Sequence, residues 1–179
     1  MSTPRLSETS YAVLGLLEQC GPSTPYQLKQ IAQESIFHFW SIPHTQLYTE
    51  CARLAQAGLL DERQEQHGRR RRVFSLAASG RRELELWRAD PRTDIYELRD
   101  PGLLKLFCGA DPAALASEQL RLHEARLARY EEILAASAVE PSVPAGMRLS
   151  LEAGIGHARE YIRFWRAVLG GAGTCRNVR

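Results

Sequence analysis

The sequence lacks the cysteine patterns of a metal-binding or disulfide-bonded protein. Four cysteines occur in 179 residues, and they stand far apart, at Cys20, Cys51, Cys108 and Cys175. Without a C-x-x-C pair, this spacing gives neither a zinc-ligand pattern nor a disulfide framework. Cys20 and Cys51 lie in apolar stretches, where a free thiol behaves as a small hydrophobic residue. The cysteines therefore favour a reducing, cytoplasmic environment.

Long apolar runs and catalytic motifs are also missing. No segment reaches the roughly 18 consecutive apolar residues that suggest a membrane-spanning helix, and the N-terminus lacks the pattern of a signal peptide. The sequence contains no G-x-S-x-G, H-E-x-x-H, G-x-G-x-x-G or P-loop motif, and its histidines do not stand at metal-ligand spacing. We expect no enzyme, no membrane contact, no cofactor and no metal. A site whose residues converge only in space, metal sensing and redox sensing at Cys175 are weaker alternatives.

Positive charge is concentrated in one short segment. The net charge of the chain is only +2, but the stretch between Gln66 and Arg82 holds six arginines and no acidic residue. Four of these arginines are consecutive, Arg69–Arg72. A nucleic-acid interaction must therefore be local to this part of the surface.

The N-terminal half of the chain predicts three helices followed by two short strands. Ser7 and Thr24 are suitable N-caps for helices over 8–20 and about 25–34, and Pro43 can open a third that ends near Gly58. The segments "LLDERQEQ" and "RRVFSLA" follow, joined by a turn at His67-Gly68, and a further helix leads to Trp87. This order is that of a winged helix-turn-helix domain, which we assign to residues 1–90.

The C-terminal half predicts a helical module. A polar linker between Pro91 and Pro101 leads to a short apolar helix, "LLKLFCG", and then to long helices over about 112–137 and 145–170. We assign residues 91–170 to this linker and module, and 171–179 to a disordered tail. The fold class is therefore mainly α, with a small β-hairpin wing and a C-terminal antiparallel helical dimerisation module.

The two long helices carry repeating apolar positions that we interpret as a dimer interface. A two-helix arm is not expected to bury both of these stripes without a second copy. The alternative is that both stripes pack on the N-terminal domain. The residues assigned to dimerisation are Leu120, Leu127, Leu134, Ile155, Ile162 and Trp165.

The third helix and the arginine-rich turn together indicate DNA binding. The major groove is about 12 Å wide and admits one helix, and a neighbouring turn rich in arginine suits the phosphate backbone. Glu50 is the acidic exception, which we expect on the flank of the helix. The alternative for the arginines is a solvated loop. The residues predicted to contact bases or phosphates are His44, Thr45, Gln46, Tyr48, Thr49, Arg69, Arg70, Arg71 and Arg72.

Aromatic residues are candidates for an effector pocket. Phe39 and Trp40 lie directly before the third helix, and Trp87 ends the fourth. Aromatic-lined cavities often hold small ligands, so we consider a small aromatic or other apolar effector here. The alternative is that these side chains only pack the two modules together.

Several motifs resemble the PadR family of transcriptional regulators. They are "YAVLGLL", "PYQL", "QLYTECARLAQAGLL" and "GRRRRVFSLAASG". The wing pattern of the family, Y-x-L-T-x-x-G, is matched with Phe74 in place of Tyr and Ala77 in place of Thr, and Ala77 loses a capping hydroxyl. The resemblance is strong over 6–87 and weaker beyond.

The resemblance implies a function and further site residues. It implies a homodimer that binds a near-palindromic operator in double-stranded DNA, usually as a repressor, and that releases DNA when a small molecule binds. It also implies that Tyr26 lies near a phosphate. The alternative from another class is a winged-helix adaptor that binds a protein partner and has no sequence-specific DNA binding.

Overall fold

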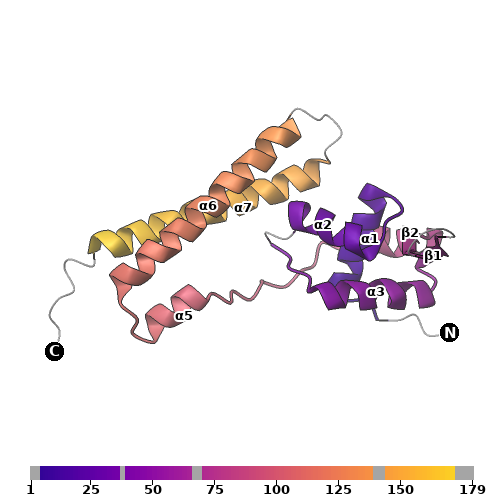
Figure 1. Ribbon diagram of the computed structural model, residues 1–179, viewed down its shortest axis with the longest axis horizontal. Helices are drawn as coiled ribbons and strands as arrows, with labels where there is room; N and C mark the ends of the chain where they lie inside the picture. Colours follow the sequence, from indigo (N-terminus) through magenta and orange to yellow (C-terminus); the bar gives the residue numbers. More distant parts are fainter. Residues whose placement is uncertain (1–4, 37–38, 66–69, 139–143, 172–179) are drawn as a thin grey trace. The chain divides into compact units, whose positions relative to one another are not determined.

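The computed structural model describes residues 5–36, 39–65, 70–138 and 144–171. The chain divides into two compact units, Met1–Asp94 and Ile95–Arg179, close to the expected boundary at residue 90. Helices and strands follow one another along the described chain, and Figure 1 labels all of them except α4. They are α1 (Glu8–Cys20), α2 (Pro25–Ser35), α3 (His44–Gln56), β1 (Leu60–Gln64), β2 (Arg72–Leu76), α4 (Ala78–Ala89), α5 (Pro101–Phe107), α6 (Pro112–Ala138) and α7 (Ala145–Gly171).

The first two helices begin at reciprocal caps. The Ser7 hydroxyl accepts a bond from the Ser10 amide at 3.3 Å, and the Ser10 hydroxyl accepts one from the Ser7 amide at 2.8 Å. Thr24 and Gln27 repeat this arrangement at α2, where Pro25 occupies the first turn. Each pair satisfies two amides that the helix itself cannot.

The first unit is built on a core shared by its three N-terminal helices and the hairpin. α3 ends at Gln56 with Ala57 as its C-cap, and Gly58 follows with φ of +71°, a conformation that favours glycine. The fully buried side chains nearest the centre include Leu14, Leu28, Leu54 and Phe74. The cluster comprises Val13, Leu14, Leu16, Leu17, Leu28, Ala32, Ile42, Leu47, Cys51, Leu54, Leu59, Leu60, Phe74 and Leu84.

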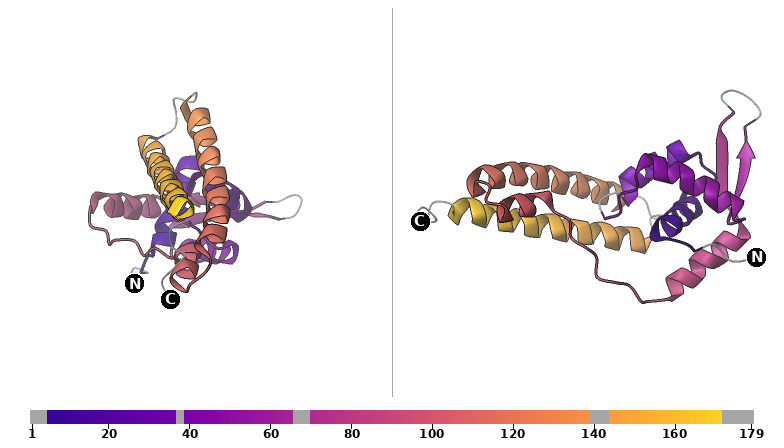
Figure 2. Two further views of the ribbon diagram at one scale, coloured as in Figure 1. Left: turned by 90° about the vertical axis from the view of Figure 1, so that its left-hand side faces the viewer. Right: turned by 90° about the horizontal axis from the view of Figure 1, so that it is seen from below.

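The two strands form an antiparallel hairpin that projects from the helices of this unit (Figure 2). Leu60 pairs with Leu76 and Gln64 pairs with Arg72. Phe74 also exchanges two backbone hydrogen bonds of 2.9 Å with Ser23, in the connection between α1 and α2. The hairpin is thus bonded to the helix-turn-helix segment as well as packed against it.

Gly80 allows α4 to start directly against the connection between α3 and β1. A Cβ atom at this position would lie 2.2 Å from the carbonyl oxygen of Leu59. Ala77 is the N-cap of α4 and makes no side-chain capping bond, as expected from its lost hydroxyl. Glu18 of α1 binds Arg81 and Arg88 of α4 and joins these two helices on the surface.

The second unit is a short helix followed by a helical hairpin. Asp100 caps α5 and accepts bonds from the amides of Gly102 and Leu103 at 2.6 and 3.1 Å. α6 and α7 pack against each other and cross at an angle in Figure 1, and two ion pairs join them: Arg159–Glu131 at 2.9 Å and Arg166–Glu124 at 2.8 Å. The prediction of a mainly helical chain with one β-hairpin is confirmed. Gly171, the first residue of the proposed tail, is instead the last residue of α7, whereas residues 172–179 and the turn at His67-Gly68 lie outside the described residues.

Candidate nucleic-acid interface

The outward side of α3 carries a continuous uncharged stripe. Leu47, Cys51 and Leu54 are buried on the inner side. Because successive residues are rotated by about 100° around a helix, the opposite side is occupied at every third or fourth position. These outward residues are Thr45, Thr49, Ala52 and Gln56, of which Ala52 is the least exposed. The sequence prediction included Thr45 and Thr49 but missed Ala52 and Gln56, which complete the same spacing.

Two aromatic rings lie on one flank of this stripe. His44 and Tyr48 are both exposed, and their ring centroids are 4.7 Å apart. Thr49 uses its hydroxyl hydrogen within the helix, where it donates to the Thr45 carbonyl at 2.9 Å. The side chains of this flank and of the central stripe have no formal negative charge, as a surface that approaches DNA requires.

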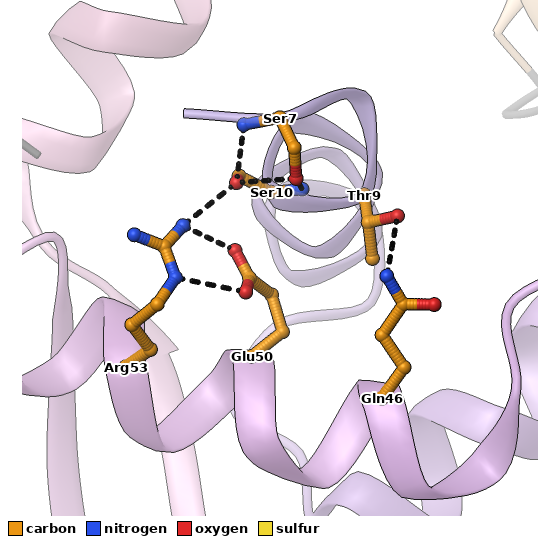
Figure 3. A network of polar contacts seen from close by, with 6 residues as sticks. All are labelled: Ser7, Thr9, Ser10, Gln46, Glu50 and Arg53. Carbon is orange, nitrogen blue, oxygen red and sulfur yellow. Dashed lines mark hydrogen bonds and ion pairs between the residues drawn. The ribbon is translucent and has the colours of Figure 1, made fainter. Parts of the chain in front are cut away.

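The other flank of α3 is tied to the start of α1 (Figure 3). Glu50 is 8% exposed and accepts bonds from Arg53 Nε and Nη2 at 2.9 and 2.6 Å. Arg53 Nη2 also donates to the Ser10 hydroxyl at 2.9 Å. The two-point hydrogen bond from Arg53 lowers the pKa of Glu50, against the opposing effect of burial. Glu50 thus lies on the flank, as expected, but it is a buried, paired carboxylate rather than an exposed one.

Gln46 belongs to this same flank rather than to the outward stripe. Its amide Nε2 donates to the Thr9 hydroxyl at 3.4 Å, although its side chain remains exposed. Figure 3 shows Gln46 pointing toward the first turn of α1. The structure therefore separates Gln46 from Thr45 and Thr49, with which the sequence interpretation had grouped it.

The hairpin divides its arginines between two faces. Side chains alternate along each strand, so Glu62, Arg72 and Phe74 share one face and Arg63, Arg71 and Val73 share the other. Arg72 binds both oxygens of Glu62 at 2.5 and 2.7 Å, and its guanidinium lies 5.1 Å from the Phe74 ring centroid. Arg70 and Arg71 are exposed, and Arg70 has φ of +46°. Arg69 lies outside the described residues.

Tyr26 lies in the first turn of α2 and is accessible. Its side chain is 55% exposed, and its hydroxyl accepts a bond from Gln30 Nε2 at 3.5 Å. The phenol keeps its own hydrogen available for a further acceptor such as a phosphate oxygen.

The effector candidates are in different environments. Phe39 is 56% exposed, whereas Trp40 is half-buried against the core of the first unit. The Trp40 indole nitrogen has no hydrogen-bond partner among the described residues. Trp87 is stacked on Tyr11, with ring centroids 4.6 Å apart and an interplanar angle of 10°.

The residues assigned to dimerisation are already covered within one chain. Ile155, Ile162 and Trp165 are 5%, 5% and 0% exposed, and α6 packs against α7. Leu120, Leu127 and Leu134 are half-buried on α6. The expectation that a two-helix arm leaves both stripes exposed is therefore wrong for the α7 stripe, whereas the three α6 leucines are only partly covered.

Other chemistry finds little support in the described part of the chain. No group of three or more histidine, cysteine, aspartate or glutamate side chains there could hold a metal ion. Burial raises the pKa of the Cys51 thiol to about 12, so this cysteine is not a nucleophile at neutral pH. Within the same residues, no helix combines the length and the apolarity needed to cross a bilayer.

Comparisons with known proteins match both units. Residues 13–86 match the Transcriptional regulator PadR-like family, and residues 98–170 match the Virulence activator alpha C-term family. The Negative transcriptional regulator PadR of Bacillus subtilis is 26% identical over 174 residues, which cover 89% of this chain and 94% of that protein.

Solved structures extend this likeness to the whole fold. B. subtilis PadR in complex with operator DNA covers 93% of this chain and 99% of that one, with a TM-score of 0.77 and 22% identity. Its complex with p-coumaric acid gives a TM-score of 0.70 with 27% identity over 92% of this chain and 94% of that one. The Vibrio cholerae virulence activator AphA gives 0.69 with 25% identity over 92% and 97%.

Proposed function

Because this chain belongs to the PadR-like family of transcriptional regulators, we propose that it is a homodimeric repressor that binds an operator duplex through α3 and the β1–β2 hairpin. The family is one of regulators, so the protein is not an enzyme. Repression is proposed because the B. subtilis relative is a negative regulator and aligns with most of this chain. A protein of this kind acts in the cytoplasm, where it meets DNA.

The uncharged outward stripe of α3 carries this proposal. Thr45 and Thr49 offer hydroxyl and methyl groups to base edges, while His44 and Tyr48 lie toward one phosphate backbone. Arg70 and Arg71 are exposed on the hairpin that packs beside α3, where each can replace a counterion on a phosphate. Tyr26 adds a phenol for a further phosphate contact.

We place the dimer interface on a different surface from the apolar stripes of α6 and α7 that the sequence suggested, because the α7 stripe is buried within one chain. Leu149 and Phe164 are 59% and 38% exposed, and by helical spacing both lie on the side of α7 away from the α6–α7 seam. Leu122 is 45% exposed on the outer side of α6. We assign the partner copy to these outer faces. A symmetric dimer would then present two α3 helices to half-sites about 34 Å apart.

A small effector completes the proposal. The B. subtilis relative was solved with p-coumaric acid, an aromatic carboxylic acid. Phe39 and Trp40 precede α3 directly, so a ligand that repacks them would shift the start of this helix. We therefore propose a small aromatic or apolar molecule that weakens DNA binding.

A mobility-shift titration with the promoter upstream of the protein's own gene tests this function. The expected result is a complex that forms at nanomolar protein, weakens steeply with salt and is lost on a shuffled duplex of the same composition. An adaptor would give no salt-sensitive, sequence-dependent complex, which would reject the proposal. Sedimentation of Leu149→Ser/Phe164→Ser tests the dimer separately: a monomer with an unchanged melting temperature supports it, and an intact dimer rejects this surface.

A further inference from the structure

Arg53 has two of its three guanidinium nitrogens committed to protein partners. Nε and Nη2 bind Glu50, and Nη2 also binds Ser10. Nη1 has no partner among the described residues, and Figure 3 shows it pointing away from both. Because a guanidinium is planar, fixing one edge also fixes the direction of the free nitrogen.

Burial is unequal across this ion pair. The Glu50 side chain is 11% exposed, whereas the Arg53 side chain is 36% exposed. The carboxylate therefore lies behind the cation, between α3 and α1, and the cation faces solvent. A second anion can therefore approach Arg53 from the solvent side, without entering the protein interior.

The position of Arg53 on α3 places it beside the outward stripe. It follows Gln46 by seven residues, which is about two helical turns, so both lie on one flank with Thr49 between this flank and the centre. His44 and Tyr48 occupy the opposite flank. A helix that inserts into the major groove turns its flanks toward the two sugar-phosphate backbones. The sequence interpretation did not single out Arg53.

The geometry points to Arg53 as a phosphate-binding residue of α3, held in its binding orientation by Glu50 and Ser10. This inference rests on the proposed DNA-binding function. The Arg53 side chain is already fixed, so it loses little further conformational entropy when it binds a phosphate. This is its advantage over the exposed side chains of Arg70 and Arg71 on the hairpin. Nη1 then donates a charge-assisted hydrogen bond to a phosphate oxygen.

The test compares Glu50→Gln with Glu50→Gln/Arg53→Gln on operator and on shuffled duplex, across a salt series. Neither variant leaves a buried carboxylate unpaired, and the double variant keeps the net charge of the wild type. We expect the double variant to bind both duplexes roughly tenfold more weakly than Glu50→Gln. Its slope of log affinity against log salt should be smaller by about one unit for each bound protomer.

A purely structural role for the pair would leave this slope unchanged, and an unchanged slope would overturn the inference. Arg126→Gln is the charge control, because Arg126 is exposed on α6 and lies outside the unit that carries α3 and the hairpin. A similar fall in slope for Arg126→Gln would also overturn it, as a general charge effect. A wild-type protein that binds no duplex would instead reject the proposed function itself.

Folding is checked by thermal melting of each variant. If the double variant is unfolded at the assay temperature, Glu50→Gln/Arg53→Lys replaces it. Lysine keeps the charge but not the planar fork, so affinity should fall several-fold with the slope retained. Affinity equal to that of Glu50→Gln would overturn the inference.

Discussion

Arg72 grips both carboxylate oxygens of Glu62 across the β1–β2 hairpin, at 2.5 and 2.7 Å. The two-point hydrogen bond lowers the pKa of Glu62 and raises that of Arg72, so the pair stays charged at neutral pH. Arg72 is therefore bound to a carboxylate within the protein, whereas the sequence prediction assigned DNA contact to all four consecutive arginines.

Replacement of Arg71 and of Arg72 should have different effects on DNA binding and on stability. We expect Arg71→Ala to lower the salt slope of DNA binding by about one unit per bound protomer, because this side chain is exposed and has no ion pair with any described residue. Arg72→Ala should leave the slope nearly unchanged and lower the melting temperature instead. Equal effects of the two variants in mobility-shift titrations would contradict the division between the two faces.

Gly80→Ala should destabilise the first unit. The added methyl group would lie 2.2 Å from the Leu59 carbonyl oxygen, which belongs to the backbone and cannot rotate away. Overpacking of this kind costs about 1–3 kcal/mol or more. Urea denaturation measures the loss, and Gly156→Ala is the control because a Cβ there meets nothing within 4 Å. Equal stability of the Gly80 variant and the wild type would show that α4 can shift.

Trp165→Phe should cost much less than Trp165→Ala. Trp165 is fully buried, so truncation to alanine should lower the free energy of unfolding by about 3–5 kcal/mol. Its indole nitrogen has no hydrogen-bond partner within the described residues, so phenylalanine removes an unsatisfied donor while it keeps most of the ring. We expect Trp165→Phe to stay within about 1 kcal/mol of the wild type by chemical denaturation. Similar losses in both variants would indicate that the nitrogen is bonded.

The contribution of Glu50 to stability should depend on pH. Its pKa is lowered in the folded protein, mainly by Arg53, so its stabilisation is present above the unfolded value of about 4.3. This stabilisation is lost as pH falls through the lower, folded value. The wild type should therefore exceed Glu50→Gln in unfolding free energy near neutral pH, and the difference should shrink in acid. A difference that grows toward low pH would show that folding raises the pKa of Glu50 instead of lowering it.

Local rules predicted most of the fold. Thr24 with Pro25 marks the start of α2, and Gly58 marks the end of α3, because caps and positive φ are properties of single residues. The winged helix-turn-helix order follows from these boundaries and from the two strands. Ser7 could be predicted as the N-cap of α1, but its reciprocal bond with Ser10 could not, since serine stands at the position where Glu or Gln is usual.

Partner choice between distant residues could not be predicted in the same way. The sequence around Arg53 does not indicate its bond to Ser10, and the sequence around Gln46 does not indicate its bond to Thr9. The repeating apolar residues of α6 and α7 were assigned to dimerisation, but periodicity does not say whether a contact lies within one chain or between two. Ile155 and Ile162 are buried without a second copy.

The two hydrogen bonds between Ser23 and Phe74 bear on how such a regulator can be switched. They hold the hairpin against the connection between α1 and α2, so these two segments cannot separate without breaking two buried backbone hydrogen bonds. The hairpin and the α1–α2 connection would therefore move together as one piece. The proposed effector near Phe39 and Trp40 would then act at the start of α3, an element that these two bonds do not hold.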